Sequence, residues 1–340
     1  MKRLVVALAL LAAGCSVPAE PTLPHRPAPQ PAPEGAAFSP AAPVAQQSTC
    51  TGVPRSLNPN KLVRAANGLP SGAAFDAIRA KGQLVVGVSQ TLQQLSSRDL
   101  RTGVMDGLEI RLTERIADAV FGTVAPEDRP KKIRYVAVPT GSRFESLDTK
   151  ENRAQPDSAK RNAVKVDMVI ADATMTCQRE QTYGLLYSSP YLVAQQGILV
   201  RGTVEKKPTD LTAFAGRKVC AAENTVNIAR ILKSAATPVS VPDSADCMVM
   251  LQRGQVDAVV TDDVILAGFA AQDRNSTVLP DSSAGPDPAG VAISNEAPEL
   301  VRMVNAVLEQ MRADGSLADL YQTFFGGLNK SVPPPDYRNE

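Results

Sequence analysis

The side chains available for chemistry in this chain are mainly carboxylates and guanidiniums, because histidine is almost absent. The only histidine, His25, lies among prolines. This excludes Ser-His-Asp and Cys-His catalysis and most zinc sites. Two residues stand out as binding groups. Arg179 carries a planar guanidinium that suits a carboxylate, and Asp262 follows a buried apolar run whose end should open into a cleft. The plainer alternatives are a surface salt bridge for Arg179 and a helix N-cap for Asp262 or Asp263.

The first cysteine belongs to a predicted export signal. Lys2 and Arg3 precede an apolar run at residues 4–13, which is short for a membrane span. Residues 11–15, Leu-Ala-Ala-Gly-Cys, resemble a bacterial lipobox. The resemblance implies a diacylated Cys15, and therefore an exported protein anchored by lipid at the outer face of the cell membrane. The alternative is an ordinary signal peptide with a chance cysteine.

Composition and charge limit the partners. The 340 residues include 36 basic and 35 acidic side chains and no tryptophan, which argues against nucleic acid. Residues 16–47 are rich in Pro, Ala and Gln and predict an extended, disordered tether. Residues 50–70 still read as irregular, so signal, tether and arm occupy residues 1–15 and 16–70. Residues 148–165 are polar and predict a surface insertion.

Periodicity predicts an α/β protein built from two units. In the first unit, apolar runs predict strands and the four-residue spacing over residues 108–120 predicts an amphipathic helix. The pattern then restarts after Gly216 and ends in two helices, so the sheets should be largely parallel. The predicted strands are residues 83–88, 133–138, 166–171, 218–221, 239–241, 256–260 and 291–293. The predicted helices, besides residues 75–78 and 108–120, are residues 225–232, 245–252, 264–271, 298–312 and 317–325.

Several segments, in order, resemble the polar-amino-acid branch of type-2 periplasmic binding proteins, the bacterial solute-binding protein family 3. Residues 187–191, Tyr-Ser-Ser-Pro-Tyr, are similar to the family's Phe-Ser-x-Pro-Tyr, and residues 254–263 are the strongest match. Residues 81–88, 106–110, 166–171 and 317–326 also resemble family segments. Residues 219–222, Val-Cys-Ala-Ala, and a cysteine just before Arg179 resemble glutamate/glutamine-binding ABC-transporter lipoproteins of high-GC Gram-positive bacteria.

The resemblance implies a two-lobed type-2 periplasmic-binding-protein fold with two crossover hinge strands. Lobe one would be residues 73–197 plus 291–327, and lobe two residues 202–285. The crossovers would lie at residues 198–201 and about 278–291. The implied protein is a monomer without cofactor or metal, which delivers glutamate or glutamine, with aspartate or asparagine next, to an ABC permease.

The resemblance also implies a ligand site. Arg179 and Thr174 match the family's carboxylate-binding residues, and Asp262 matches its ammonium-binding aspartate. Asp172 stands where relatives have a small or neutral residue, and either contacts the ammonium or caps a turn. Thr225 and Val226 begin a helix whose N–H groups would face an anionic group.

Three further residues have weaker roles. Gln90 and Arg98 follow the first strand and could bind the ligand's side chain, or could be ordinary loop residues. Glu223 replaces a glycine of the family's pattern and would repel an acidic ligand if it pointed inward.

Four cysteines remain beyond Cys15. An even number in an exported chain predicts two disulfides, and sequence alone allows three pairings. No CxxC motif indicates redox work or metal binding. By resemblance, the pairs would be Cys220–Cys247 and Cys50–Cys177.

Two other functions remain open. A sensor would use the same cleft and pass its closed form to a membrane signalling partner. An enzyme on the same fold would need a spare acid or base, for which Glu223 and Asp172 are the candidates.

Overall fold

A computed structural model describes residues 31–39, 52–203, 208–281, 284–326, 328 and 330–338. The chain divides into two compact units, Met1–Pro31 and Ala32–Glu340, and only Pro31 of the first is described. The predicted signal, Cys15 and Cys50 therefore lie outside the described residues. Within the described part, no helix combines the length and apolarity that a membrane span needs.

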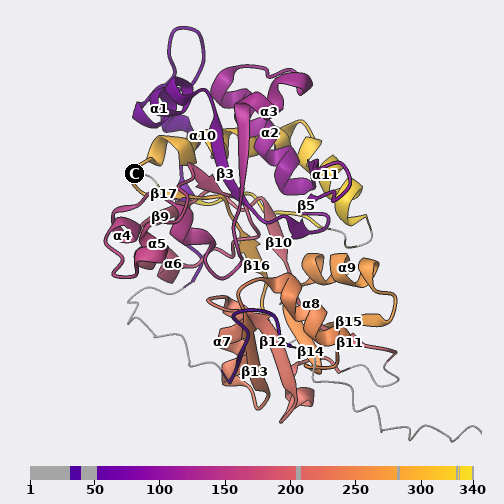
Figure 1. The fold of residues 1–340 in the computed structure, drawn as a ribbon. Coiled ribbons are helices and arrows are strands. Elements are labelled where there is room, and N and C mark those ends of the chain that lie inside the picture. The colour runs from indigo at the N-terminus through magenta and orange to yellow at the C-terminus, as the bar shows by residue number, and fades with distance from the viewer. Residues whose placement is uncertain are drawn as a thin grey trace, which may run out of the picture. The chain divides into compact units, whose positions relative to one another are not determined.

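The first of two main sheets, sheet one, has five strands in the order β7-β3-β8-β17-β9. Its strands β3, β9 and β17 are labelled in Figure 1. Strand β3 is parallel to β7 and β8, and every residue in it is buried, as its unbroken apolar sequence predicts. Strand β17 returns antiparallel to β8 and β9. The strands are β3 (Leu84–Val88), β7 (Ile133–Ala137), β8 (Met168–Val169), β9 (Leu185–Tyr187) and β17 (Ala292–Ser294).

Helices with one apolar stripe accompany sheet one. Helix α10 packs against α2, α11 and β17, and α2 also contacts β3. The helices are α1 (Ala73–Lys81), α2 (Leu108–Phe121), α3 (Arg129–Lys132), α4 (Lys150–Arg153), α5 (Ser158–Arg161), α6 (Cys177–Tyr183), α10 (Pro298–Ala313) and α11 (Ser316–Phe325), with 3-10 turns η1 (Pro59–Lys61), η2 (Pro126–Asp128) and η3 (Arg143–Ser146). A small sheet is formed by β4 (Thr91–Leu92), β5 (Ser96–Arg98) and β6 (Met105–Asp106).

The second main sheet, sheet two, has six strands in the order β1-β13-β12-β14-β11-β15. Its strands β12, β13 and β14 are parallel, while β11 is antiparallel to β14 and β15. They are β1 (Ala37–Phe38), β11 (Gln196–Arg201), β12 (Lys218–Ala222), β13 (Thr237–Val241), β14 (Ala258–Asp262) and β15 (Ser276–Pro280). Helices α7 (Val226–Lys233), α8 (Ser244–Gln252) and α9 (Asp263–Gln272) pack on these strands, and η4 (Leu211–Phe214) follows β11 (Figure 1).

The chain passes twice between the two sheets, which makes the fold two-lobed. Strand β10 (Leu192–Ala194) precedes β11 and pairs antiparallel with β16 (Asp287–Ala289), which follows β15. Residues 198–201, expected as the first crossover, belong to β11 inside sheet two. We call the elements around sheet one lobe one and those around sheet two lobe two.

Part of the predicted tether is structured, so the prediction of a disordered segment is wrong for residues 37–38. Strand β1 extends the edge of sheet two by pairing antiparallel with β13. The Lys218 ammonium lies 5.4 Å from the centre of the Phe38 ring and adds a cation–π contact. The polar, proline-rich composition concealed this pairing because an edge strand needs only backbone hydrogen bonds.

The arm that follows also docks on the globular part. Strand β2 (Ser56–Leu57) pairs in parallel with β18 (Tyr337–Arg338). The buried Asn305 amide nitrogen on α10 donates to Leu57 O at 2.6 Å and to Ser56 Oγ at 2.7 Å. A buried polar residue of α10 therefore helps to hold this part of the arm.

Candidate functional site

A small cavity lies between elements of the two lobes and has a volume of about 20 Å³, the space of about one water molecule. It brings together four of the eight predicted ligand residues. Its lining residues are Leu92, Thr140, Arg143, Ala171, Asp172, Thr174, Thr225, Asn227, Ser244, Thr261, Asp262 and Ile265.

Direct hydrogen bonds join the lobes beside the cavity. The Gly141 amide donates to Pro242 O at 2.9 Å, and Asn224 Nδ2 donates to Gly141 O at 3.1 Å. The Thr91 hydroxyl donates to Asp243 Oδ1 at 3.2 Å. The structure is therefore a closed form, whose cavity is too small for an amino acid.

Asp262 lies at the end of β14 and is only 3% exposed. It is the N-cap residue of α9, but its side chain makes no capping hydrogen bond in that helix. Asp263 instead accepts from the Val264 amide at 2.9 Å and the Gln195 amide at 3.1 Å. Asp262 is therefore the N-cap by position, while its carboxyl group makes no capping bond and Asp263 carries the side-chain contacts at the helix start.

Asp172 follows β8 and faces the same cavity. Its φ of 45° lies in the left-handed region, which aspartate tolerates better than most residues. Glu109 holds the turn from α2, where its buried carboxylate accepts from the Asp172 amide at 2.6 Å and the Tyr191 hydroxyl at 2.6 Å. No N–H or O–H group of the described residues donates to either Asp172 carboxylate oxygen, so the turn-cap alternative is wrong.

The two cavity aspartates strongly influence each other. Burial and the charge of Glu109 raise the pKa of Asp172 to about 7. Burial, and then repulsion by Asp172, raise the pKa of Asp262 well above its usual range. The interaction between the two carboxyl groups raises the pKa of Asp262 further and offsets part of the rise at Asp172, so the two groups titrate as a pair.

Arg143 supplies the opposite charge and was missed by the sequence analysis. It lies in η3, is 3% exposed, and lines the cavity. Its Nη1 donates to Thr140 O at 2.7 Å, whereas its Nε has no acceptor among the described residues. Burial and the nearby Arg179 lower the pKa of Arg143 to about 10, so it stays charged at neutral pH. The feature of the sequence that could have identified Arg143 as a site residue was its position after a predicted strand of a parallel sheet.

Arg179, predicted to bind the ligand carboxylate, is buried beside the cavity but does not line it. Its Nη1 donates to Thr174 O at 2.7 Å, and its Nη2 reaches across to lobe two and donates to Asn224 O at 3.2 Å. Both arginine guanidiniums lie over the Phe144 ring, with carbon-to-centre distances of 5.1 Å for Arg143 and 5.0 Å for Arg179. Two cations close to one ring make a favourable place for an anion.

Lobe two contributes the start of α7. Thr225 is its N-cap, and its hydroxyl accepts from the Ile228 amide at 3.3 Å, while Val226 is the first helical residue. Asn224 adopts a φ of 54°, which asparagine tolerates without the family's glycine. The buried Asn227 Oδ1 lines the cavity without a donor in the described part, a second residue that sequence reasoning missed.

The remaining polar candidates lie elsewhere. Arg98 Nε donates to Gln90 Oε1 at 3.2 Å, and both residues line a separate groove of about 1060 Å³ between the β4–β6 hairpin and helices α8 and α9. Glu223 is not among the cavity residues; its side chain lies against Gly141, where an added Cβ would come within 2.4 Å of it. The structure therefore does not bring these three residues together with the cavity aspartates.

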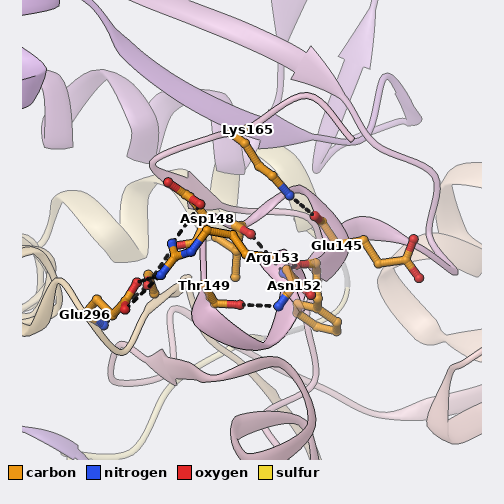
Figure 2. Close-up of polar contacts among 10 residues, drawn as sticks. Glu145, Asp148, Thr149, Asn152, Arg153, Lys165 and Glu296 are labelled. Atoms are coloured by element: carbon orange, nitrogen blue, oxygen red, sulfur yellow. Dashed lines mark hydrogen bonds and ion pairs between the residues drawn. The ribbon is translucent and has the colours of Figure 1, made fainter. Parts of the chain in front are cut away.

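The predicted surface insertion supports Arg143. The fully buried Asn152, labelled in Figure 2, donates from Nδ2 to Phe144 O at 2.7 Å and Leu147 O at 2.9 Å, and so holds the η3 turn in place. Arg153 bridges Asp148 at 2.9 Å and Glu296 at 2.8 Å, as Figure 2 shows. This part of the chain is thus more than a surface loop, because it fixes the turn that carries a cavity cation.

Comparison with known proteins agrees with this geometry. Residues 157–327, half of the chain, match the family described as bacterial extracellular solute-binding proteins, family 3. The ABC transporter glutamine-binding protein GlnH of Bacillus subtilis is 25% identical over 248 residues, which cover 72% of this chain and 82% of GlnH. The glutamate/glutamine/aspartate/asparagine-binding protein BztA of Rhodobacter capsulatus is 26% identical over 226 residues, which cover 63% of this chain and 59% of BztA.

A solved structure shows the same fold. A mutant of ArgBP from T. maritima superposes with a TM-score of 0.62 at 23% identity, covering 75% of this chain and 100% of that one. The family match, the two sheets and the paired crossover strands agree on one assignment. This chain belongs to the bacterial extracellular solute-binding proteins of family 3, and is a binding protein and not an enzyme.

Proposed function

We propose that this protein captures a polar amino acid outside the cytoplasm and delivers it to an ABC permease. The observation that carries the proposal is the charge distribution around the cavity. Asp172 and Asp262 offer buried carboxyl groups that form no ion pair among the described residues, while Arg143 offers a buried guanidinium whose Nε has no acceptor among them. These groups are complementary to the ammonium and carboxylate of one amino acid.

The same charges explain why binding would involve lobe movement. The closed cavity of about 20 Å³ has no room for a ligand, so the lobes must separate to admit one. Only closure on the ligand would place groups of both lobes around its α-carbon substituents. Ligand would therefore shift the population toward a closed form that is expanded at this site.

The ligand class follows from the site and the relatives together. Asn227 Oδ1 is a buried acceptor in the cavity and suits a side-chain amide. The relatives' names specify glutamine in one case and glutamate, glutamine, aspartate and asparagine in the other. We infer glutamine or glutamate as the preferred ligand, with asparagine or aspartate next.

A calorimetric screen of the twenty amino acids tests this inference. We expect at least one of the four to bind with a dissociation constant at or below about 1 µM, corresponding to about −8 kcal/mol. Tight binding of a basic or large aromatic amino acid, with none of these four, would contradict it.

Lipid anchoring at Cys15 is part of the proposal. Two acyl chains hold a protein stably at a membrane, and the lobes would then work beside their permease. Cys15→Ala should shift the protein from the membrane fraction to the medium, or leave it as an uncleaved precursor. Metabolic palmitate labelling is the measurement, and persistent labelling of the variant would show that the lipobox interpretation is wrong.

We also propose the lobe boundaries, residues 73–197 plus 291–327 for lobe one and 202–285 for lobe two. In support, all five strands of sheet one fall in the first set, and β12 to β15 fall in the second; β11 (Gln196–Arg201), which also belongs to sheet two, crosses the boundary at residue 197.

A further inference from the structure

Asp172 and Asp262 face one cavity from different lobes, and neither carboxyl group forms an ion pair within the part of the chain that the structure describes. Asp172 is 6% exposed and Asp262 3% exposed, so water solvates neither carboxyl group well. Two adjacent buried carboxylates cannot both ionise cheaply without a counter-charge. The pair therefore requires one cation.

The surroundings supply little of that positive charge. Glu109 is itself buried and acidic. Its carboxylate oxygens already accept hydrogen bonds from the Ser96 hydroxyl at 2.7 Å and the Tyr191 hydroxyl at 2.6 Å. Arg143 is the cation nearest to Asp172, and its Nη2 contacts the backbone oxygen of Asp172 at 3.5 Å. The charged or titratable groups facing the pair are Glu109 and Tyr191 from lobe one, Arg143 from η3, Asp287 from β16 and Asp263 from α9.

A metal ion does not fit as the missing cation. No group of three or more His, Cys, Asp or Glu side chains in the described ranges is arranged to hold one. The cavity admits little more than one water molecule. A proton needs no space, and in the open form an amino-acid ammonium could enter.

We propose that Asp172 and Asp262 form a single cation position, occupied by a proton when the lobes close empty and by the ligand's ammonium when they close on an amino acid. The proposal rests on the proposed amino-acid ligand. On binding, the O–H bond of the shared carboxyl breaks and the proton leaves to the buffer. The ammonium then lies between two carboxylates, and no other bond changes.

The direction of the pH dependence follows from the two forms. Below about pH 4 both carboxyls are protonated in open and closed lobes alike, so closure has no charge penalty. In the closed form burial raises the pKa of Asp172 to about 7, so between about pH 4 and 7 the closed lobes retain a proton that the open lobes lose. Empty closure therefore becomes less favourable as pH rises through this window, and it continues to weaken at higher pH until the closed-form Asp262 carboxyl has also lost its proton.

Proton release upon binding is the first test. L-Glutamine is titrated into the full chain at pH 6 in buffers of different ionisation enthalpy. We expect release of about 0.5–1 proton per ligand, and an affinity that falls by up to about tenfold per pH unit on the acid side of the pair's titration. Asp172→Asn keeps the side-chain shape and tolerates the left-handed φ. It should reduce proton release to less than half of the wild-type value.

The matched control is Asp319→Asn, an exposed carboxylate on α11, which should release protons like the wild type. Binding of glutamine without proton release in the wild type would overturn the proposal and leave the amino-acid function standing. Equal release from wild type and Asp172→Asn would also overturn it.

Empty closure provides a test that needs no ligand. Small-angle scattering of the ligand-free chain should show a more compact particle at pH 5 than at pH 8. Asp172→Asn should shift the midpoint of this change by at least about one pH unit towards acid or abolish it, because an amide removes one of the two repelling charges. A pH-independent wild-type radius, or identical midpoints in the two proteins, would contradict the shared cation position.

Discussion

We expect Asp262→Ala and Arg179→Ala each to weaken amino-acid binding by about 30- to several-thousand-fold, which corresponds to about 2–5 kcal/mol. Asp262 lines the cavity and is proposed to pair with the ligand ammonium; Arg179, which the family resemblance assigns to the ligand carboxylate, lies beside the cavity and adds positive charge there, and these side chains are 3% and 7% exposed. A ligand charge left without its partner in such a dry space loses hydration without compensation. Calorimetry on folded variants measures the change directly.

The two variants should differ in the absence of ligand. Arg179 donates to carbonyl oxygens in both lobes, at 2.7 Å to Thr174 and 3.2 Å to Asn224, so its removal leaves buried acceptors unpaired. That should cost about 1–3 kcal/mol of stability and lower the melting temperature. Asp262 faces another carboxyl, so Asp262→Ala should leave the ligand-free melting temperature unchanged or raise it.

Charge-matched variants separate the site from general charge effects. Arg179→Lys should also lose most of the affinity, because an ammonium does not reproduce the planar fork of donors. Arg134→Ala and Asp319→Ala remove exposed charges on β7 and α11 and should bind like the wild type. Wild-type affinity in both Asp262→Ala and Arg179→Ala would place the binding site elsewhere on the chain.

Loss of the Cys220–Cys247 disulfide should lower the free energy of unfolding by about 3.5 kcal/mol. The bond closes a loop of 27 positions, for which the chain-entropy relation gives about this value. Cys220 lies on β12 and Cys247 on α8, and both are fully buried. The bond thus ties a central strand of sheet two to the helix that covers it. Denaturant unfolding of the double variant Cys220→Ala/Cys247→Ala measures the loss.

The two alanines also leave a small void in the core. The control is therefore wild-type protein unfolded with and without reductant, because reduction leaves the cysteine side chains in place. An unfolding free energy within about 1 kcal/mol of wild type in both comparisons would show that the bond contributes little.

The structure confirms the predicted pairing of Cys220 with Cys247. Cys177 is also disulfide-bonded, and its predicted partner Cys50 lies outside the described residues. Non-reducing peptide mapping should recover Cys50 linked to Cys177.

Local pattern was sufficient for most of the elements that form the two sheets. The predicted helix at residues 298–312 is α10 (Pro298–Ala313), and the predicted strand at residues 83–88 is β3 (Leu84–Val88). These segments bury an uninterrupted apolar run or one apolar stripe, and such burial leaves a period in the sequence. Short elements were missed for the opposite reason. Strand β10 has three residues and helix α6 seven, too few to show a period.

Four cavity-lining residues were also predictable, because they stand in family motifs at strand ends. Asp172 and Thr174 follow β8, Asp262 is the last residue of β14, and Thr225 follows β12. Parallel strands of one sheet end at the same edge, so residues just after them converge whatever the loop details. Gln90 and Arg98 also follow a strand, but β4 and β5 turn the chain away into a hairpin. Their pairing with one another then leaves them in a different groove.

The sequence by itself determined the fold class, the family and four of the residues that line the cavity, because periodicity and ordered motifs are local properties of a chain. Only the tertiary structure decided which charges meet. Arg143 enters the cavity because Asn152, nine residues further on, holds the η3 turn in place. Asp172 lacks a donor because closure sets it against Asp262, 90 residues away in another lobe. Electrostatic energy depends on distance and burial, and neither is encoded in the spacing of residues along the chain.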